Sequence, residues 1–183
     1  MSIDLLQPHL SNTLDPAAVS SGLIAGIIGD RPSFYAKSPS LWNAAFQDLG
    51  MDAVFLPFDV EPQSLGSLVT AYRECHNLVG GSVTVPYKVE VIQHLDELDS
   101  KARQIGAVNT IVRESDGRLV GYNTDGQGFI DMMTKPLPDQ GDAFLESLDG
   151  MSVLLVGSGG AARAVAVFLG EAVGPEGKVF ICN

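Results

Sequence analysis

The stretch LLVGSGGAARA at residues 154–164 decides the fold of the C-terminal part of this chain. An apolar run ends at a glycine-rich turn that fits the pattern GxGxxA, and a helix is predicted from Ala161 to Leu169. With strands predicted at Ser152 to Val156 and at Lys178 to Cys182, the stretch indicates one βαβ unit of a dinucleotide-binding (Rossmann) domain. Because a parallel pair of strands cannot cover its own apolar faces, we expect residues 151–183 to be a truncated domain.

The turn supplies candidate residues for binding a dinucleotide. Small residues let a pyrophosphate approach the helix N-terminus, whose amides and dipole favour an anion. A turn that needs glycine only for its backbone is the alternative interpretation. The candidates are Gly157, Ser158, Gly159, Gly160 and Ala161. At the end of the second strand stands Asn183, where a site for NAD would more often have an acidic residue, so NADP is favoured over NAD.

Upstream of this unit, short apolar runs alternate with amphipathic segments, which is typical of an α/β protein. The runs are LIAGII, AVFLPF and LVGGSVTV. One helix has a clear start, with Ser38 as the N-cap, Pro39 as the first helical residue and Gly50 as the stop. Its apolar residues recur at helical spacing and are expected to face a sheet. These residues are Leu41, Trp42, Ala45, Phe46 and Leu49.

The remaining segments are predicted from shorter patterns. The turn sequence Ser115-Asp116-Gly117 predicts a hairpin that joins a strand at Ala107 to Arg113 with one at Arg118 to Asn123. Helices are predicted at Val89 to Leu95 and Leu98 to Ile105, with a short one near Ala143 to Leu148.

Composition excludes several classes of protein. The 183 residues are 45% apolar and 18% charged, enough for a full core. The net charge of -11 argues against nucleic acid or an anionic membrane as the partner. Cys75 and Cys182 suggest neither a disulfide framework nor a zinc site. With no secretory or membrane-spanning pattern, we expect a soluble, cytoplasmic protein.

Polar residues follow strand ends in three motifs: VTVPYK at 83–88, GAVNT at 106–110 and GYNTDGQGF at 121–129. Such residues can converge on a small polyhydroxylated ligand. Lys88 and Asp125, if they meet in a cleft, form a proton-transfer unit suited to alcohol oxidation. Taken singly, Lys88 is typical of a solvated surface lysine and Asp125 of a helix N-cap.

The ordered set VTVPYK, IGAVNT, GxNTDGxGF and GSGGAARA resembles the shikimate dehydrogenase family and its quinate-using relatives, over roughly residues 23–183. The resemblance implies an enzyme of aromatic amino acid biosynthesis that interconverts 3-dehydroshikimate and shikimate with NADP. It also implies a substrate-binding domain followed by a cofactor domain, and a small cyclic hydroxy acid as the ligand. By the same resemblance Lys88 and Asp125 are catalytic, and Ser38, Thr84 and Asn109 bind substrate.

Four parts of the chain follow from these patterns. We expect an N-terminal arm at 1–21, an α/β substrate-binding domain with a mostly parallel sheet at 22–133, a linker at 134–150 and the partial Rossmann domain at 151–183. The arm is predicted to be loose or to form one marginal helical turn, without a function.

The chain departs from the family pattern at the substrate loop. The family's HSxSP is YAKSP here, so Ala36 stands where one of two carboxylate-binding serines would be, and Ser82 replaces an asparagine. Loss of that hydrogen bond is worth about 1.5–3 kcal/mol for a charged acceptor unless Tyr35 or Ser33 compensates. Quinate dehydrogenase and a non-catalytic shikimate- or quinate-binding relative therefore remain alternatives. A methylene-tetrahydrofolate-type dehydrogenase is disfavoured by GAVNT and NTDGQGF.

Overall fold

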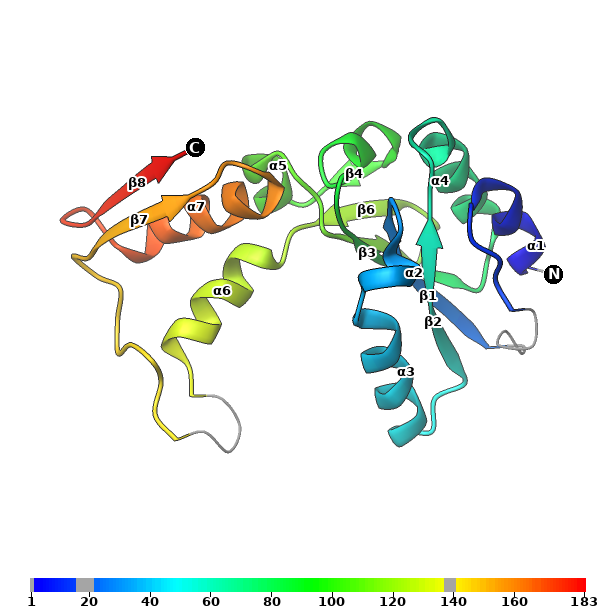
Figure 1. Ribbon diagram of the computed structural model, residues 1–183, viewed down its shortest axis with the longest axis horizontal. Helices are drawn as coiled ribbons and strands as arrows, with labels where there is room; N and C mark the ends of the chain where they lie inside the picture. Colours follow the sequence, from blue (N-terminus) through cyan, green and yellow to red (C-terminus); the bar gives the residue numbers. More distant parts are fainter. Residues whose placement is uncertain (1, 16–21, 137–140) are drawn as a thin grey trace. The chain divides into compact units, whose positions relative to one another are not determined.

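The computed structural model describes residues 2–15, 22–136 and 141–183 (Figure 1). Parts of the predicted arm and linker lie outside these ranges. The chain divides into two compact units, one of Met1–Asp99 with Val108–Tyr122 and one of Ser100–Ala107 with Asn123–Asn183.

A six-stranded sheet, counted over the described residues, forms the centre of the first unit (Figure 1). The strand order is β2-β1-β3-β5-β6-β4, and three of the five neighbouring pairs are parallel. The prediction of an α/β fold with a mostly parallel sheet is confirmed. The strands are β1 (Leu23–Gly29), β2 (Ala53–Asp59), β3 (Leu78–Val83), β4 (Glu97–Leu98), β5 (Thr110–Arg113) and β6 (Leu119–Tyr122).

The predicted hairpin is present as the antiparallel pair β5 and β6, with Thr110 opposite Tyr122. Gly117 has a φ of 89°, which a residue with a side chain rarely adopts, and the Gly117 amide donates to the Glu114 carbonyl at 2.9 Å. The Ser-Asp-Gly signal thus marked the turn correctly, although both strands are shorter than expected.

Two helices, α3 (Ser38–Asp48) and α4 (Leu65–Glu74), cover opposite faces of β2. The Trp42 ring of α3 stacks on Phe55 with centroids 6.1 Å apart. The Tyr72 ring of α4 meets Phe58 edge to face at 5.9 Å. Because side chains alternate along a strand, Phe55 and Phe58, three residues apart, point to opposite faces of the sheet.

The apolar residues of α3 were expected to face the sheet as part of the core. Trp42 does stack on the sheet through Phe55, but the burial expected of core residues is not found. No described residue of α3 is buried, and Leu41 and Leu49 are each 69% exposed. The physical reason is the position of the helix. It packs on β2, which is an edge strand, so the sheet covers only one side of α3.

The predicted N-terminal arm is packed rather than loose over residues 2–15. It forms α1 (Ser2–Leu6) and the 3₁₀ helix η1 (Gln7–His9), both of which contact α4. Leu6 is fully buried and Ile3 and Leu14 nearly so. Three well-spaced apolar side chains are enough to anchor a short segment whose sequence has no sustained period.

Short connections complete the first unit. They are α2 (Pro32–Tyr35), η3 (Pro62–Ser64) and η4 (Glu90–His94). The helix predicted at Val89 to Leu95 is therefore a 3₁₀ helix of five residues. The helix predicted from Leu98 begins only at Ser100, because Leu98 pairs in β4.

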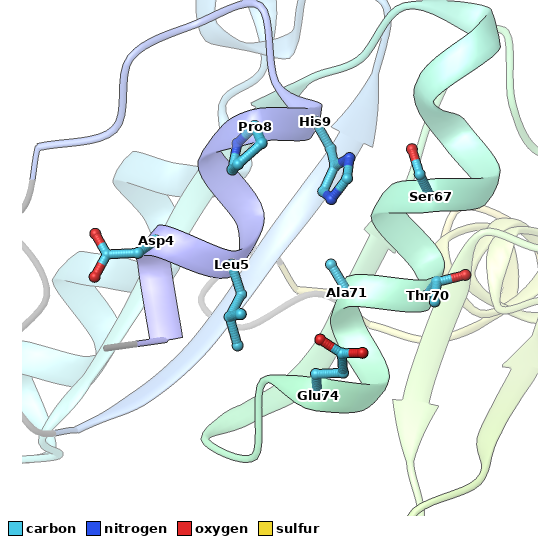
Figure 2. Close-up of a pocket in the computed structure, with 8 residues that line it drawn as sticks. All are labelled: Asp4, Leu5, Pro8, His9, Ser67, Thr70, Ala71 and Glu74. Carbon is cyan, nitrogen blue, oxygen red and sulfur yellow. The ribbon is translucent and has the colours of Figure 1, made fainter.

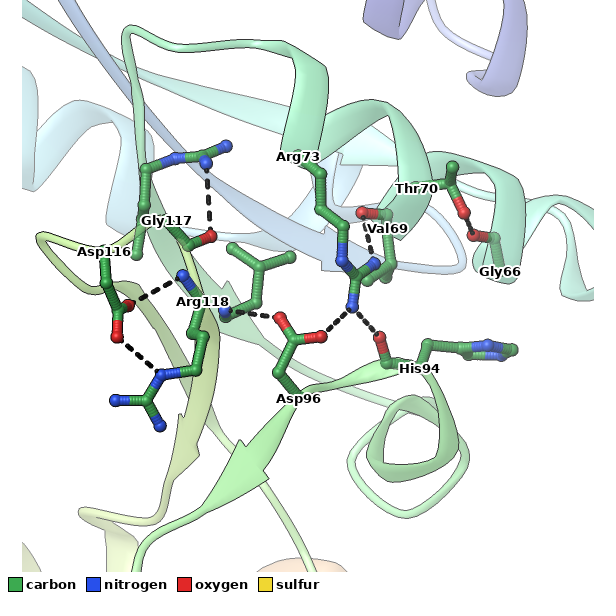
Figure 3. Close-up of polar contacts among 11 residues, drawn as sticks. Gly66, Val69, Thr70, Arg73, His94, Asp96, Asp116, Gly117 and Arg118 are labelled. Carbon is green, nitrogen blue, oxygen red and sulfur yellow. Dashed lines mark hydrogen bonds and ion pairs between the residues drawn. The ribbon is translucent and has the colours of Figure 1, made fainter.

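The Asp96 carboxylate, just before β4, links β6 to α4 (Figure 3). It accepts hydrogen bonds from the Leu119 amide at 2.8 Å and from the Arg73 guanidinium of α4 at 2.9 Å. The backbone hydrogen bond and then the Arg73 contact lower the pKa of Asp96. The carboxylate stays charged and holds the short β4 beside β6.

The second unit contains the predicted βαβ unit, with β7 (Ser152–Val156), α7 (Gly160–Ala172) and β8 (Lys178–Cys182). The strands pair in parallel, as predicted. Two helices pack against α7: α5 (Ser100–Ile105) and α6 (Asp125–Thr134).

Two features of the second unit differ from expectation. Helix α6 belongs to it, although the predicted substrate domain extends to residue 133. Gly126 explains this packing, since a Cβ there would lie 2.3 Å from the Phe168 ring of α7. Residues 143–148 form no helix; Leu148 packs instead against Leu169 and Val173.

Tyr72 generates a prediction about stability. Its hydroxyl is the one fully buried side-chain polar atom without a hydrogen-bond partner in the described part of the chain, and burial raises its pKa well above the ordinary value. We expect Tyr72→Phe to raise the free energy of unfolding by about 1 kcal/mol in urea denaturation, because an unsatisfied buried group is removed.

Tyr87 provides the matched control for that experiment. Its buried hydroxyl donates to the Val60 carbonyl at 2.6 Å, so Tyr87→Phe should lower the free energy of unfolding by about 1 kcal/mol. An equal loss in both variants would contradict the assignment of Tyr72 as unsatisfied.

Candidate functional site

The first unit places several strand ends at one edge of its sheet. Strands β1, β2 and β3 are parallel and end at Gly29, Asp59 and Val83. Strand β5 runs the other way, so its start lies beside the end of β3, where the Val83 amide donates to the Asn109 carbonyl at 2.7 Å. In open α/β sheets, ligands bind outside the carboxyl ends of parallel strands.

Main-chain hydrogen bonds hold the turn that carries Lys88 at this edge. The Thr84 amide donates to the Ile28 carbonyl at 2.8 Å, and the Val108 amide donates to the Lys88 carbonyl at 2.7 Å. The Asn109 side chain accepts the Thr110 hydroxyl at 2.9 Å. The structure therefore brings the backbones of Thr84, Lys88 and Asn109 together at one sheet edge, and all three residues are half-buried.

The loop after β1 adds Tyr35 to this edge. The Tyr35 hydroxyl lies 3.0 Å from a carboxylate oxygen of Asp30 and 3.5 Å from the Val85 carbonyl, and it also contacts the Thr84 side chain. Gly29 allows this convergence, since a Cβ there would lie 2.6 Å from Thr84 Cγ2 and 3.0 Å from the Tyr35 hydroxyl. Tyr35 thus contacts a residue for which the sequence predicted substrate binding.

Asp59 is a charged residue at this edge that sequence reasoning missed. Its carboxylate accepts the Ser33 amide at 2.9 Å and the Ser33 hydroxyl at 2.5 Å. The hydroxyl hydrogen of Ser33 is therefore committed, and Ser33 does not replace the serine absent at Ala36. The position of Asp59 directly after the apolar run AVFLPF was the signal that could have found it.

Ser38 lies one position further into the helix than predicted. The N-cap of α3 is Lys37, no side chain caps the helix by a hydrogen bond, and Ser38 is the first helical residue. The N-cap prediction for Ser38 is wrong, because Lys37 is already the residue that flanks the helix. Its role in substrate binding stays a prediction.

Asp125 lies in the second unit, as the first residue of α6. Its amide donates to the Asn123 side-chain oxygen at 3.1 Å, and Asn123 Nδ2 donates to the Ala107 carbonyl at 3.0 Å. Asn123 is buried, so the Asn of the NTDG motif fixes the start of α6. The pairing of Lys88 with Asp125 stays a prediction, because the two residues belong to different units.

The glycine-rich turn combines two kinds of glycine. Gly157 has a φ of 112°, which residues with a side chain rarely adopt, so the backbone conformation requires glycine at this position. Gly159, the N-cap of α7, has an ordinary φ of -68°, and a Cβ built there meets no atom of the described residues within 4 Å. The backbone does not demand glycine at 159, and the open space suits the close approach of a ligand to the helix N-terminus. The role of Gly157, Ser158, Gly159, Gly160 and Ala161 in binding a dinucleotide pyrophosphate stays a prediction.

A separate groove of about 350 Å³ lies between the N-terminal segment and α4 (Figure 2). It contains none of the predicted site residues. Its walls are Asp4, Leu5, Pro8, His9, Ser67, Thr70, Ala71 and Glu74.

Neither a membrane-spanning helix nor a metal site is found in the described residues. No helix there is long and apolar enough to cross a membrane. No cluster of three or more His, Cys, Asp or Glu side chains in residues 2–15, 22–136 and 141–183 could hold a metal ion.

A mostly parallel α/β unit, followed along the chain by a βαβ unit with a glycine-rich turn, defines a two-part protein with a Rossmann-type second part. Residues 27–111 match the shikimate dehydrogenase substrate binding domain. The shikimate dehydrogenase (NADP(+)) of Shouchella clausii is 44% identical over 146 residues, covering 80% of this chain and 50% of that protein. The predicted resemblance to the shikimate dehydrogenase family is confirmed.

Solved structures of shikimate dehydrogenases are similar to this chain in fold and in sequence. A crystal structure of a shikimate dehydrogenase in complex with NADP+ has a TM-score of 0.75 and 36% identity, covering 94% of this chain and 54% of that one. Shikimate 5-dehydrogenase from Listeria monocytogenes in complex with shikimate and NAD has a TM-score of 0.74 and 31% identity, with coverages of 93% and 55%. The chain spans about half the length of the curated relatives it matches.

Tyr35 gives a testable pH dependence. Burial, and then the hydrogen bond with Asp30, raise its pKa from 10.0 to about 12. An unfolded chain loses the Tyr35 proton near pH 10, whereas the folded chain keeps it to about pH 12. Between these values the unfolded state binds fewer protons, so stability falls as pH rises.

We expect the absorbance difference between the parent protein and Tyr35→Phe to titrate near pH 12, and the free energy of unfolding to fall less steeply in Tyr35→Phe between pH 10 and 12. Asp30→Asn should lower the midpoint of the Tyr35 titration. A midpoint that Asp30→Asn leaves unchanged would contradict the contact.

Proposed function

We propose that this chain carries the substrate-binding domain and the first part of the NADP-binding domain of a shikimate dehydrogenase. The enzyme would interconvert 3-dehydroshikimate and shikimate, in the cytoplasm, as a step of aromatic amino acid biosynthesis. The observation that carries the proposal is the group of Thr84, Lys88 and Asn109 held at one strand edge by main-chain hydrogen bonds. The sequence match to the substrate binding domain supports it.

The proposed roles follow from the chemistry of each side chain. Thr84, Asn109 and Ser38 would hydrogen-bond the ring hydroxyls and the carboxylate of the substrate. During oxidation the neutral amine of Lys88 would take the proton of the reacting hydroxyl and become an ammonium, and during reduction that ammonium would return the proton. Asp125 would orient the lysine side chain. With a net charge of -11, the protein must bind an anionic substrate through such local contacts.

The glycine-rich turn supports NADP as the cofactor, with NAD as the less favoured choice. Gly157, Gly159 and Gly160 would let the pyrophosphate reach the N-terminus of α7, with Ser158 and Ala161 beside it. When bound, the cofactor supplies the hydride acceptor or donor. Asn183 at the end of β8 carries no charge that would repel a 2′-phosphate.

Binding without catalysis is the second candidate function, and quinate is the second candidate substrate. The observation that keeps both open is Ala36, which lacks the hydroxyl expected for the substrate carboxylate, while Ser33 is committed to Asp59. Thermal-shift titration with shikimate, quinate and NADP identifies which of them binds, since a ligand of the native state raises the melting temperature. Turnover of the bound hydroxy acid with NADP then separates catalysis from binding alone.

Lys88→Ala tests the mechanism. In the natural gene product we expect kcat for shikimate oxidation to fall about 10²- to 10⁴-fold, the usual contribution of a general acid–base group, followed by NADPH absorbance. Lys101→Ala is the control, because Lys101 pairs with Glu171 in the second unit. Undiminished turnover in Lys88→Ala would overturn the proposed role.

Ala36→Ser tests the substrate loop. The added hydroxyl should lower KM for shikimate about tenfold or more, because a hydrogen bond to a carboxylate contributes about 1.5–3 kcal/mol. Ala36→Cys adds a side chain of similar size with a weak donor and should have a smaller effect. An unchanged KM in Ala36→Ser would show that this position does not contact the carboxylate.

A further inference from the structure

Asp59 is unusual because it is the one buried charged residue in the described part of the chain. A buried carboxylate needs hydrogen-bond donors to offset its lost hydration. Two donors come from a single residue, the amide and the hydroxyl of Ser33, at 2.9 and 2.5 Å. Asp59 therefore fixes the first turn of α2, twenty-six residues earlier in the chain.

The N-terminal segment holds the main chain of Asp59 from the other side. The Asn12 side chain accepts the Asp59 amide at 2.9 Å and donates to the Pro57 carbonyl at 3.0 Å. The Ser11 amide donates to the Asp59 carbonyl at 2.9 Å. These three contacts lie on the outer edge of β2, the edge that faces away from β1.

The geometry of Asn12 is itself fixed. Gln7 Nε2 donates to the Asn12 carbonyl at 2.9 Å, and Gln7 Oε1 accepts the Leu14 amide at 2.9 Å. Leu6 and Leu14, on either side, are buried. The segment at 6–14 is therefore held in place by its own hydrogen bonds and buried side chains, and it fixes the end of β2 in turn.

Beyond Ser33, the loop leads to the strand edge described above. Tyr35, two residues later, places its hydroxyl against Asp30 and Thr84. Ser38 follows at the start of α3. The chain of contacts thus runs from Asn12 through Asp59 and Ser33 to the loop that carries the predicted substrate contacts.

We propose that Asp59 is a positioning residue for this loop. Asn12 holds the Asp59 main chain, and the Asp59 carboxylate sets the position of residues 30–38 over the strand edge. This position determines how well the cyclic hydroxy acid binds. The role in substrate binding rests on the proposed function, whereas the link between the N-terminal segment and the loop stands on the contacts alone.

The chain offers a matched control at the other half of β2. The Asn43 side chain donates to the Phe55 carbonyl at 3.0 Å and accepts the Phe55 amide at 2.7 Å. Asn12→Ala and Asn43→Ala each remove two hydrogen bonds between a side-chain amide and the outer edge of β2. Only Asn12 supports the residue that binds Ser33.

Trypsin reports on the loop directly. Lys37 is exposed and precedes Ser38, whereas the Arg31 bond precedes proline and resists the enzyme. We expect Asn12→Ala and Ser33→Ala to speed cleavage after Lys37 about five- to thirtyfold relative to cleavage after Arg118, as the loss of one or two hydrogen bonds implies. Asn43→Ala should leave this ratio within about twofold.

A ratio that rises equally in Asn43→Ala, or that stays unchanged in Ser33→Ala, would overturn the link. Asp59→Asn is a second variant, chosen because it keeps the shape of the side chain and folds more readily than Asp59→Ala. It should raise the ratio less than Ser33→Ala. In Asp59→Asn the amide oxygen still accepts the Ser33 amide and the amide nitrogen can donate to the Ser33 hydroxyl oxygen, whereas Ser33→Ala removes the hydroxyl contact altogether.

Kinetics of the natural gene product test the positioning role. Asn12→Ala and Ser33→Ala should raise KM for shikimate about tenfold with KM for NADP unchanged, and Ser33→Thr, which keeps the hydroxyl, should restore it. A loosened loop with an unchanged KM for shikimate would overturn the role. If the parent protein binds no shikimate, the proposed function fails, and the proteolysis ratio still decides the link.

Discussion

The hydrogen bond from the Val108 amide to the Lys88 carbonyl, at 2.7 Å, is the contact on which the site depends. It joins the turn after β3 to the residue just before Asn109 and β5, two segments twenty residues apart. Together with the bond from the Thr84 amide to the Ile28 carbonyl, it closes that turn onto the sheet. The side chains that would meet substrate are thus carried by backbone whose position is set by sheet pairing, which is more rigid than a free loop. A change that opened this turn would move Thr84 and Lys88 away from Asn109, which stays paired with Val83 and Tyr122.

Sequence patterns predicted the elements whose signals are local. Strand β8 and strand β7 matched their predicted bounds, because each is an apolar run bounded by turn residues. The Ser-Asp-Gly turn was found for the same reason. The exposed face of α3 was not predicted, since Leu41 and Leu49 fit a buried helix equally well. What decides their exposure is the place of β2 at the edge of the sheet, and strand order depends on contacts distant in sequence.

The candidate site divides in a similar way. Lys88, Asp125 and the glycine turn came from motifs and from a family resemblance, and three of the substrate-domain candidates do lie at the predicted strand edge. The contacts of Asp59 and Asn12 could not be predicted in this way, because they span twenty-six and forty-seven residues and neither residue belongs to a motif. The one local signal was the position of Asp59 directly after an apolar run. The two glycines at 157 and 159 look alike in sequence, yet only the first has a backbone that requires glycine. The structure therefore distinguishes a glycine that the backbone conformation requires from one that leaves space beside the helix N-terminus.

The outer edge of β2 carries no unpaired main-chain groups from Phe55 to Asp59. Side-chain amides of Asn43 and Asn12 pair with Phe55, Pro57 and Asp59, the Ser11 amide takes the Asp59 carbonyl, and Pro57 has no amide hydrogen to offer. An open strand edge is a template on which another chain can add a strand. The two asparagine side chains form the hydrogen bonds that a neighbouring strand would form, so no further strand can pair with this edge. Asn12, which supports the loop through Asp59, thus also protects the sheet from edge-to-edge aggregation.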